Sequence, residues 1–276
     1  MQIKCGDLNL EATLNSGQVF GFKKGPDGSF SGNLLGHPSQ ISHTNGQLSI
    51  ASEYSHSIDK VRSYFDLSQN LDTVYQVLEN ELPLRPALKA YRGLRVLRQD
   101  PWEALACFIL SSNNNVKRIQ GIHKNLCAYF SRRAGRLADT FPSAHEIASS
   151  HERILRELGL GYRAPFLLHT AKFLSRNDLY LEQIRSAEHS EALSRVLAFP
   201  GIGPKVADCV LLYGFHRLDT FPVDVWILRA MRKIYFRNRR VSEQRVHDFG
   251  RKRWGAWSGY VQQYIFHGAR NGVLHC

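Results

Sequence analysis

The sequence lacks the long apolar segments that mark membrane proteins and exported proteins. No run of about eighteen apolar residues occurs in the chain, so we expect neither a membrane-spanning helix nor a membrane partner. The first residues, MQIKCGDLNL, contain no apolar signal-peptide core. We therefore expect an intracellular protein, located in the cytoplasm or nucleoid of a bacterium or in the nucleus of a eukaryote.

Cysteine is scarce, and its spacing matches no known metal motif. The five cysteines are scattered along the chain: Cys5, Cys107, Cys127, Cys209 and Cys276. We expect reduced thiols, with neither a disulfide framework nor an iron–sulfur cluster. No metal held by side chains is expected.

Acidic residues are too few to balance the basic ones. Lysine and arginine number 36 against 24 aspartates and glutamates, which gives a net charge of +12. Residues 1–98 carry a net +1 and residues 99–276 a net +11, so the excess lies in the second part. This distribution fits a domain that binds a polyanion such as DNA. A basic surface that only keeps the protein soluble explains the charge equally well.

The first hundred residues have mainly the pattern of strands and turns. Residues 18–24 and 29–35 have strand-like composition, and the turns GPDG and GHPS follow them. Residues 40–44 and 47–52 flank Asn45-Gly46, which is a strong signal for a two-residue hairpin. Helical periodicity appears around residues 58–80.

From Asp100 onward the pattern is helical. Asp100 is a predicted N-cap ahead of an apolar helix, and Ser143 with Glu146 forms a capping-box pattern. Further helices are expected near residues 164–175, 189–198, 204–214, 224–236, 243–253 and 258–270. The sequence thus predicts an α+β protein, with an N-terminal antiparallel β-sheet domain over residues 1–98 and an all-α domain over residues 99–276.

The segment FPGIGPKVADC, residues 199–209, joins two apolar helices through a short glycine-rich hairpin. Gly201 and Gly203 permit positive φ angles and leave the backbone amides uncovered. Those amides and the N-terminus of the helix that begins near Pro204 form an anion site suited to a DNA phosphate, which they would bind without reading bases. A purely structural turn is the commoner use of such a segment.

Lys205 lies in the first turn of this helix, where the helix dipole disfavours a positive charge. Together with burial, the dipole would favour the neutral, nucleophilic amine, and Cys209 shares its face one turn later. Asp224 follows Pro222 and precedes another apolar helix, as an N-cap does. The same carboxylate could stabilise positive charge on a sugar ring. A solvated lysine and a simple helix cap are the alternatives.

The segments around the hairpin and the aspartate, LAFPGIGPKVADC and DTFPVDVWILRAM, resemble the helix-hairpin-helix DNA glycosylases. Within that superfamily (helix-hairpin-helix-GPD) the chain is similar to the 8-oxoguanine DNA glycosylase/AP lyases nearly from end to end. Matching segments occur in order at residues 14–24, 64–67, 94–122, 158–166 and 257–266. The resemblance implies a TBP-like N-terminal domain that contributes to the base pocket, followed by a catalytic helix-hairpin-helix core.

The resemblance also implies a bifunctional DNA repair enzyme that acts on double-stranded DNA containing 8-oxoguanine opposite cytosine. It implies that the damaged nucleotide is flipped out of the duplex. Lys205 then attacks the sugar's C1′, expels the oxidised base and forms a Schiff base, and β-elimination can nick the strand. Asp224 would stabilise the cationic sugar. No cofactor is required, and a monomer is expected.

A base pocket built from distant segments follows from the same resemblance. The backbone carbonyl of Gly17 would accept the hydrogen that oxidised guanine carries on N7. Cys209 and Phe266 would lie on the two faces of the base, and Gln262 would meet its Watson–Crick edge. Taken alone, an ordinary turn at Gly17 and core packing of the other two are simpler interpretations. A buried glutamine amide needs partners, so packing explains Gln262 less easily.

Four residues match the family's contacts around the cytosine left behind by the flipped base. Asn113, Arg118 and Arg163 match its hydrogen-bond donors, and Tyr162 matches the wedge that enters the gap. A capping loop around Asn113 and a solvated Arg118 are the alternatives.

Two further features concern the hairpin and the helix after Asp224. The family's hairpin holds a monovalent or divalent cation through backbone carbonyls, here those of Leu197, Phe199 and Ile202. Trp226 stands where many eukaryotic members have histidine, which puts one phosphate contact in doubt but not the chemistry.

Two competing interpretations stay open. A glycosylase for another oxidised or alkylated base would share the fold, but the alkylated-base members lack the hairpin lysine. Thymine-glycol and adenine-mismatch members usually carry a four-cysteine cluster after the last helices, whereas only Cys276 follows Cys209 here. A non-catalytic helix-hairpin-helix module that only anchors DNA would need neither Lys205 nor Asp224.

Overall fold

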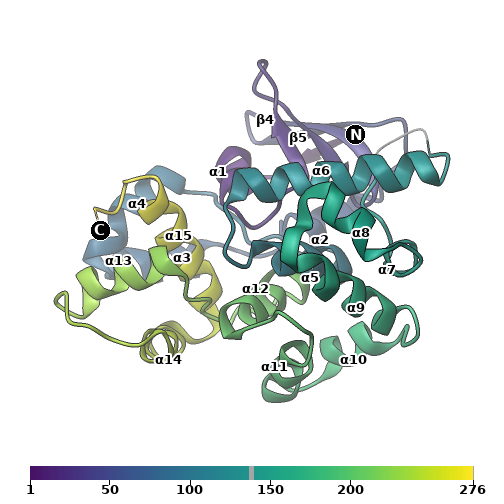
Figure 1. The fold of residues 1–276 in the computed structure, drawn as a ribbon. Helices are drawn as coiled ribbons and strands as arrows, with labels where there is room; N and C mark the ends of the chain where they lie inside the picture. The colour runs from purple at the N-terminus through teal and green to yellow at the C-terminus, as the bar shows by residue number, and fades with distance from the viewer. Residues whose placement is uncertain (137–139, 276) are drawn as a thin grey trace.

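One antiparallel sheet forms the N-terminal part of the molecule, and helices form the rest (Figure 1). The structure is a computed structural model that describes residues 1–136 and 140–275; Cys276 lies outside the described residues. The strand order is β1-β5-β4-β3-β2. The strands are β1 (Gln2–Lys4), β2 (Phe22–Lys24), β3 (Phe30–Leu34), β4 (His37–Thr44) and β5 (Gln47–Ala51). The predicted α+β class with an N-terminal antiparallel sheet is confirmed.

The predicted hairpin at Asn45-Gly46 is present. Both residues have positive φ angles, +53° and +72°, as a type I′ turn requires. They connect β4 to β5, and Thr44 pairs with Gln47 across the turn.

The turn predicted at GHPS is displaced by two residues. The chain turns at Leu35-Gly36, with φ angles of +52° and +82°, and β4 already begins at His37. Pro38 is therefore inside a strand. It is tolerated there because Leu34 and His37 form the hydrogen-bonded pair beside the two-residue turn, so the nitrogen of Pro38 faces away from β3. On its other side, β5 pairs with β4 only from Gln40 onward.

The helices follow the predicted positions closely where they are long. They are α1 (Leu10–Asn15), α2 (Ile58–Tyr64), α3 (Asp72–Asn80), α4 (Arg85–Tyr91), α5 (Pro101–Ser111), α6 (Val116–Arg133), α7 (Ala144–Ala148), α8 (Glu152–Leu155), α9 (Ala164–Leu174), α10 (Tyr180–Ser186), α11 (His189–Leu197), α12 (Pro204–Gly214), α13 (Val225–Tyr235), α14 (Glu243–Trp254) and α15 (Ser258–Arg270). Short turns of other helix types occur at η1 (Leu82–Leu84), η2 (Arg156–Leu160), η3 (Gly161–Arg163) and η4 (Gly255–Trp257). Sequence periodicity did not reveal α1, α4 and α10, which have six or seven residues each.

The predicted caps define where several helices begin. The Asp100 carboxylate accepts a hydrogen bond from the amide of Glu103 at 2.9 Å. Ser143 and Glu146 form the complete capping box, in which each side chain accepts from the other's backbone. Each cap satisfies amides that have no partner inside the helix.

Two apolar cores lie under this framework. The smaller one fills the space between the sheet and α2, with Ile41, Leu48 and Phe65 fully buried. The larger core joins α3 and α4 to the helices from α5 to α15. Figure 1 shows α3 and α4 beside α15, although these elements are far apart in the sequence. In the described part of the chain, no helix has the length and apolar character needed to cross a bilayer.

Asp66 links the N-terminal part to the C-terminal helix. Its side chain is 2% exposed and accepts a hydrogen bond from the Tyr260 hydroxyl of α15 at 2.8 Å. Arg98 forms a salt bridge with the same carboxylate at 3.0 Å, and His216 Nε2 lies 3.3 Å away. Burial opposes the charged form, but the contacts with His216, Tyr260 and Arg98 outweigh it and lower the pKa of Asp66.

We expect Asp66→Ala to destabilise the fold by about 3 kcal/mol near neutral pH, because it leaves buried partners unpaired. The lowered pKa means that this contribution is present above about pH 4, the range of an unfolded aspartate, and is lost as the pH falls through the folded-state pKa. Urea unfolding at pH 7 and at acid pH measures this, with the exposed Asp178→Asn as control. A loss of stability that does not shrink in acid would contradict it.

Candidate active site

The glycine hairpin connects α11 to α12 and lies at the surface. Gly201 has a φ of +78°, and a Cβ there would meet the Phe166 ring at 2.4 Å, so both its backbone angle and its packing require glycine. Gly203 is the N-cap of α12, and nothing would crowd a Cβ at that position. The exposed amides of this turn can therefore receive an anion.

Lys205 is the second residue of α12 and is half-buried. Its Nζ lies 5.7 Å from the centroid of the buried Phe108 ring, so the amine is directed toward α5. Cys209, one turn later, is buried, and burial raises the pKa of its thiol to about 11, with Lys205 opposing the shift. The Cys209 thiol beside the amine is therefore protonated and uncharged, and it is not a nucleophile.

Asp224 is the N-cap of α13, and its carboxylate accepts from the amide of Ile227 at 2.8 Å. Burial raises its pKa, while the Ile227 amide and the charge of Lys205 work in the opposite direction. The lysine and the carboxylate are thus near enough to interact electrostatically. Lys205, Cys209 and Asp224 therefore lie near one another in the structure, and their catalytic roles stay predictions.

Gln262 in α15 is buried, and its Nε2 donates to the backbone carbonyl of Pro222 at 3.1 Å. This bond ties α15 to the segment just before Asp224. The Oε1 of the same side chain is buried without a hydrogen-bond partner in the described residues. A buried acceptor without a partner carries an energetic cost unless a ligand supplies a donor.

Gly17 faces the same helix. It has a φ of +80°, and a Cβ would lie 3.2 Å from the Phe266 ring and 2.8 Å from the Arg270 guanidinium. Phe266 and Arg270 also contact each other, with the guanidinium 5.3 Å from the ring centroid. The space beside Gly17 is therefore occupied by these two side chains in this structure.

Arg270 was not predicted from the sequence. Its Nη2 donates to the carbonyl of Asn15, and its Nη1 is buried without a partner among the described residues. Burial lowers the pKa of this guanidinium, with Tyr91 and Asp224 opposing. The signal was available, because Gln262, Phe266 and Arg270 are spaced by four residues and so share a helix face.

Gln263, the neighbour of Gln262, was not predicted from the sequence either. Its side chain is fully buried and connects three segments. Its Nε2 donates to the carbonyl of Ser16 at 3.1 Å, and its Oε1 accepts from the hydroxyl of Tyr213 in α12. The loop at Gly17, the lysine-bearing helix and α15 are thereby held in one arrangement.

The predicted opposite-base residues gather around the loop between α5 and α6. The Arg163 side chain is buried and donates to the carbonyls of Ser112 and Asn113, the latter at 2.9 Å. Asn113 is exposed with a φ of +46°. Tyr162 is 48% exposed, donates to the Ser112 carbonyl at 3.1 Å and stacks over the Arg163 guanidinium. Arg163 therefore organises this loop.

Arg118 and Trp226 lie at the starts of two helices. Arg118 is exposed in the first turn of α6, where its amide donates to the Asn115 cap at 2.9 Å. The expected capping loop is thus real, and it leaves the Arg118 side chain at the surface. Trp226 is half-buried in the first turn of α13, with the Arg229 guanidinium 5.3 Å from its ring.

The hairpin carbonyls proposed for a cation belong to Leu197, Phe199 and Ile202. The Phe199 carbonyl accepts a hydrogen bond from the Ile202 amide at 3.3 Å. A carbonyl oxygen has a second lone pair, which this hydrogen bond leaves available for a cation. The cation site therefore stays a prediction.

A cavity of about 810 Å³ has Lys205 in its wall. Its other lining residues come from α11, α13 and α14 and the segments beside them, including Val223, Arg240 and His247. This cavity is distinct from the space between Gly17 and Phe266. Among the predicted base-pocket residues, Cys209 lies beside Lys205, Gln262 is bonded to the segment before Asp224, and Phe266 lies against Gly17.

Two family models match the chain. Residues 1–105 match the 8-oxoguanine DNA glycosylase N-terminal domain, and residues 106–256 match the HhH-GPD superfamily of base excision DNA repair proteins. A probable N-glycosylase/DNA lyase of Methanothermobacter thermautotrophicus is 32% identical over 99% of this chain and 97% of the relative.

Solved structures agree with this match. MBOgg1 in complex with a low-affinity DNA ligand superposes with a TM-score of 0.91 and 30% identity, covering 98% of this chain and 95% of that one. The 8-oxoguanine glycosylase/lyase of Clostridium acetobutylicum, bound to DNA with cytosine opposite 8-oxoguanine, superposes with a TM-score of 0.88 and 27% identity. The match covers 99% of this chain and 97% of that one. The chain belongs to the 8-oxoguanine DNA glycosylase family of HhH-GPD base excision repair proteins.

Proposed function

We propose that the protein excises 8-oxoguanine opposite cytosine from double-stranded DNA and can nick the resulting strand. The observation that carries this proposal is the pairing of a half-buried lysine with a half-buried carboxylate at the N-termini of two helices, Lys205 on α12 and Asp224 capping α13. An anchoring module would need neither group at that place. The N-glycosylase/DNA lyase and 8-oxoguanine glycosylase/lyase activities of the relatives support the same activity.

The lysine amine is the nucleophile in this proposal, so the chemistry needs no cofactor. Lys205 Nζ bonds to C1′ as the C1′–N9 bond breaks, and the bonding electrons leave with the base, which takes up a proton. Ring opening then gives a Schiff base between C1′ and Nζ. Loss of a C2′ proton expels the 3′ phosphate, and water releases the lysine.

Asp224 stabilises the positive charge that develops on the sugar and then on the imine nitrogen. Partial burial raises the pKa of this carboxylate, so it gains from a nearby cation more than a fully exposed carboxylate would. The hairpin amides at Gly201 and Gly203 hold the DNA backbone, which places C1′ against the amine.

The flipped base would enter between Phe266 and Cys209, where Phe266 and Arg270 now fill the space beside Gly17. Both side chains must move for the base to enter. The buried Oε1 of Gln262 then receives a donor from the Watson–Crick edge of the base, and the Gly17 carbonyl receives N7–H.

Borohydride trapping on an 8-oxoguanine:cytosine duplex tests the nucleophile. We expect a covalent protein–DNA adduct with the wild type and none with Lys205→Gln, because an amide cannot form the Schiff base. Lys172→Gln, an exposed substitution on α9, is the matched control and should trap normally. Trapping that survives Lys205→Gln would assign the reaction to another amine.

Substitution of Gly17 tests the base-reading carbonyl. Gly17→Ala forces a side chain against Phe266 and Arg270 and should lower kcat/KM on the lesion at least tenfold, with unchanged affinity for undamaged duplex. Gly36→Ala has the same backbone cost, about 1 kcal/mol, at a φ of +82° but meets no neighbour within 4 Å. Equal losses in the two variants would show that backbone strain, not the pocket, is responsible.

Opposite-base discrimination tests Arg118. Loss of a specific donor to cytosine should cost about 1–3 kcal/mol of discrimination, so Arg118→Ala should reduce the preference for cytosine about fivefold or more. Excision rates with each of the four opposite bases measure this. Arg133→Ala, exposed at the other end of α6, is the control. An unchanged ratio in Arg118→Ala would remove Arg118 from the cytosine contact.

A further inference from the structure

Four potential metal-binding side chains meet between α5 and α6, away from the lysine. Glu103 and Cys107 lie one turn apart on α5, and His123 and Cys127 lie one turn apart on α6. One ligand atom each of Glu103, Cys107 and His123 lies within 4.8 Å of the other two. Cys107 and His123 are buried, and Glu103 is partly exposed.

The imidazole of His123 is held in a fixed orientation. Its Nε2 lies 2.9 Å from Glu103 Oε1, and its Nδ1 lies 3.6 Å from Cys127 Sγ. The Phe141 ring stacks on it at 5.1 Å between centroids. Metal-binding histidines in proteins are oriented in this way, by a second hydrogen bond on the ring nitrogen that does not bind the metal.

The side chains around His123 are of the kinds that bind a divalent cation. A carboxylate and two thiols converge on one imidazole, and each of these groups is a common zinc ligand. Without a metal, His123 Nε2 pairs with Glu103 Oε1 at 2.9 Å. That pair leaves Cys107 unused.

We propose that Glu103, Cys107 and His123 Nε2 bind one zinc ion, and that Cys127 accepts the hydrogen bond of His123 Nδ1–H. A carboxylate, a thiolate and a divalent ion sum to zero charge with a neutral imidazole, which suits a buried site. Tetrahedral zinc keeps its ligand atoms about 3.2–3.8 Å apart. Here Nε2 and Oε1 are 2.9 Å apart and the three ligand atoms lie within 4.8 Å of one another, so small side-chain shifts would bring them to that geometry. The inference departs from the expectation that no side chain holds a metal.

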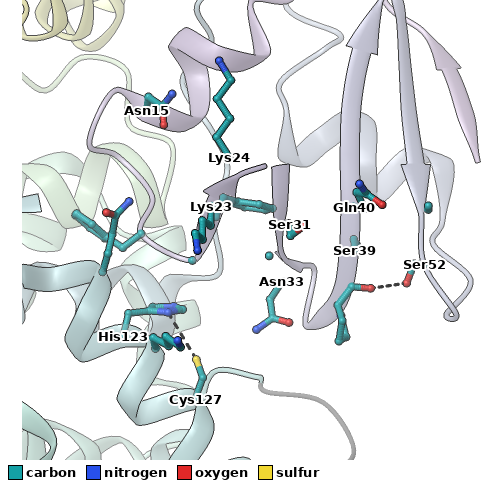
Figure 2. A pocket seen from close by; sticks show the side chains of 18 of the residues that line it. Asn15, Lys23, Lys24, Ser31, Asn33, Ser39, Gln40, Ser52, His123 and Cys127 are labelled. Atoms are coloured by element: carbon teal, nitrogen blue, oxygen red, sulfur yellow. Dashed lines mark hydrogen bonds between the residues drawn. The ribbon is translucent and has the colours of Figure 1, made fainter. Parts of the chain in front are cut away.

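The site has an approach from solvent. His123 and Cys127 line a cavity of about 1240 Å³ between α6 and the sheet, where Lys23, Asn33 and Gln40 lie opposite (Figure 2). Gly21 allows the backbone before β2 to approach His123 closely, because a Cβ at residue 21 would lie 3.0 Å from the His123 ring. A hydrated ion can therefore reach the ligands without unfolding of the domain.

A metal ion at this site would connect α5 and α6, the two helices that flank the loop containing Asn113. Cys107 lies near the end of α5, and His123 lies in α6 beyond the loop at 112–115. A metal bound by both helices fixes their separation and adds stability, since the ion binds the folded chain and has no preformed site in the unfolded one.

Cobalt binding tests the site without reference to catalysis. Chelator-treated, reduced full-length protein is titrated with Co²⁺ and then with Zn²⁺. We expect one Co²⁺ per chain, with a thiolate-to-cobalt charge-transfer band that Zn²⁺ abolishes and a Tm that rises with Zn²⁺. No band, no bound zinc and no Tm shift in the wild type would overturn the proposal and leave an ion pair between His123 and Glu103.

Variants separate the ligands from their neighbours. Cys107→Ser should lose the charge-transfer band, Glu103→Gln should weaken Co²⁺ binding at least tenfold, and Cys127→Ser should keep the band with affinity reduced about 10–100-fold. Cys5→Ser, a buried cysteine in the other core, should bind as the wild type does. A band that persists in Cys107→Ser would overturn the ligand assignment. Should that variant fail to fold, unweakened binding by the partly exposed Glu103→Gln would overturn it equally.

Discussion

The buried amide of Gln263 is the contact on which the geometry of the site depends. It joins the carbonyl of Ser16 to the hydroxyl of Tyr213, so that the Gly17 loop, the lysine-bearing helix and α15 share one anchor. An unpaired buried amide or carbonyl costs about 1–3 kcal/mol, which makes any slippage of these segments unfavourable. Gln18 adds a second anchor, since it donates to the Arg95 carbonyl and accepts from the Leu97 amide. The β-domain thus contributes to the site through a loop with little freedom.

Around this anchor the electrostatics follow from two helix starts. Helices α12 and α13 both begin at the site, and each presents the positive end of its dipole there. An aspartate at the cap of α13 suits that field, whereas a lysine in the first turn of α12 opposes it. The charge of Lys205 in turn acts on the Asp224 carboxylate. In the proposed function, the positive field of these helix starts also attracts the phosphate backbone of the DNA, which places the backbone beside the lysine.

Local signals in the sequence were sufficient for the longer helices and for several of their caps, but not for the short helices α1, α4 and α10. Asp100, Ser143 and Asp224 act through bonds to residues three positions away, and Lys205 shares a face with Cys209 through a four-residue spacing. The three-residue strand β1 is too short for an alternating pattern to show.

Tertiary contacts set the limit of what the sequence could reveal. Gln263 has partners far away in the chain, and no local pattern identifies them. Arg270 was within reach, because it continues the spacing of Gln262 and Phe266. The pairs Glu103–Cys107 and His123–Cys127 each have helical spacing, but only the packing of α5 against α6 brings them together.

The packing of Phe266 and Arg270 against Gly17 bears on how the proposed enzyme distinguishes damaged from normal guanine. Moving Phe266 and Arg270 away from Gly17 costs the same free energy for either base, so this step lowers both affinities and cannot discriminate between them. Discrimination must come from the base itself. In the proposed function, oxidised guanine would offer N7–H to the Gly17 carbonyl, whereas guanine would offer a lone pair and leave that acceptor unpaired. A missing partner for a buried group penalises the wrong ligand more than an added contact rewards the right one. The specificity therefore depends on how rigidly the loop at Gly17 is held, which is the part played by Gln263.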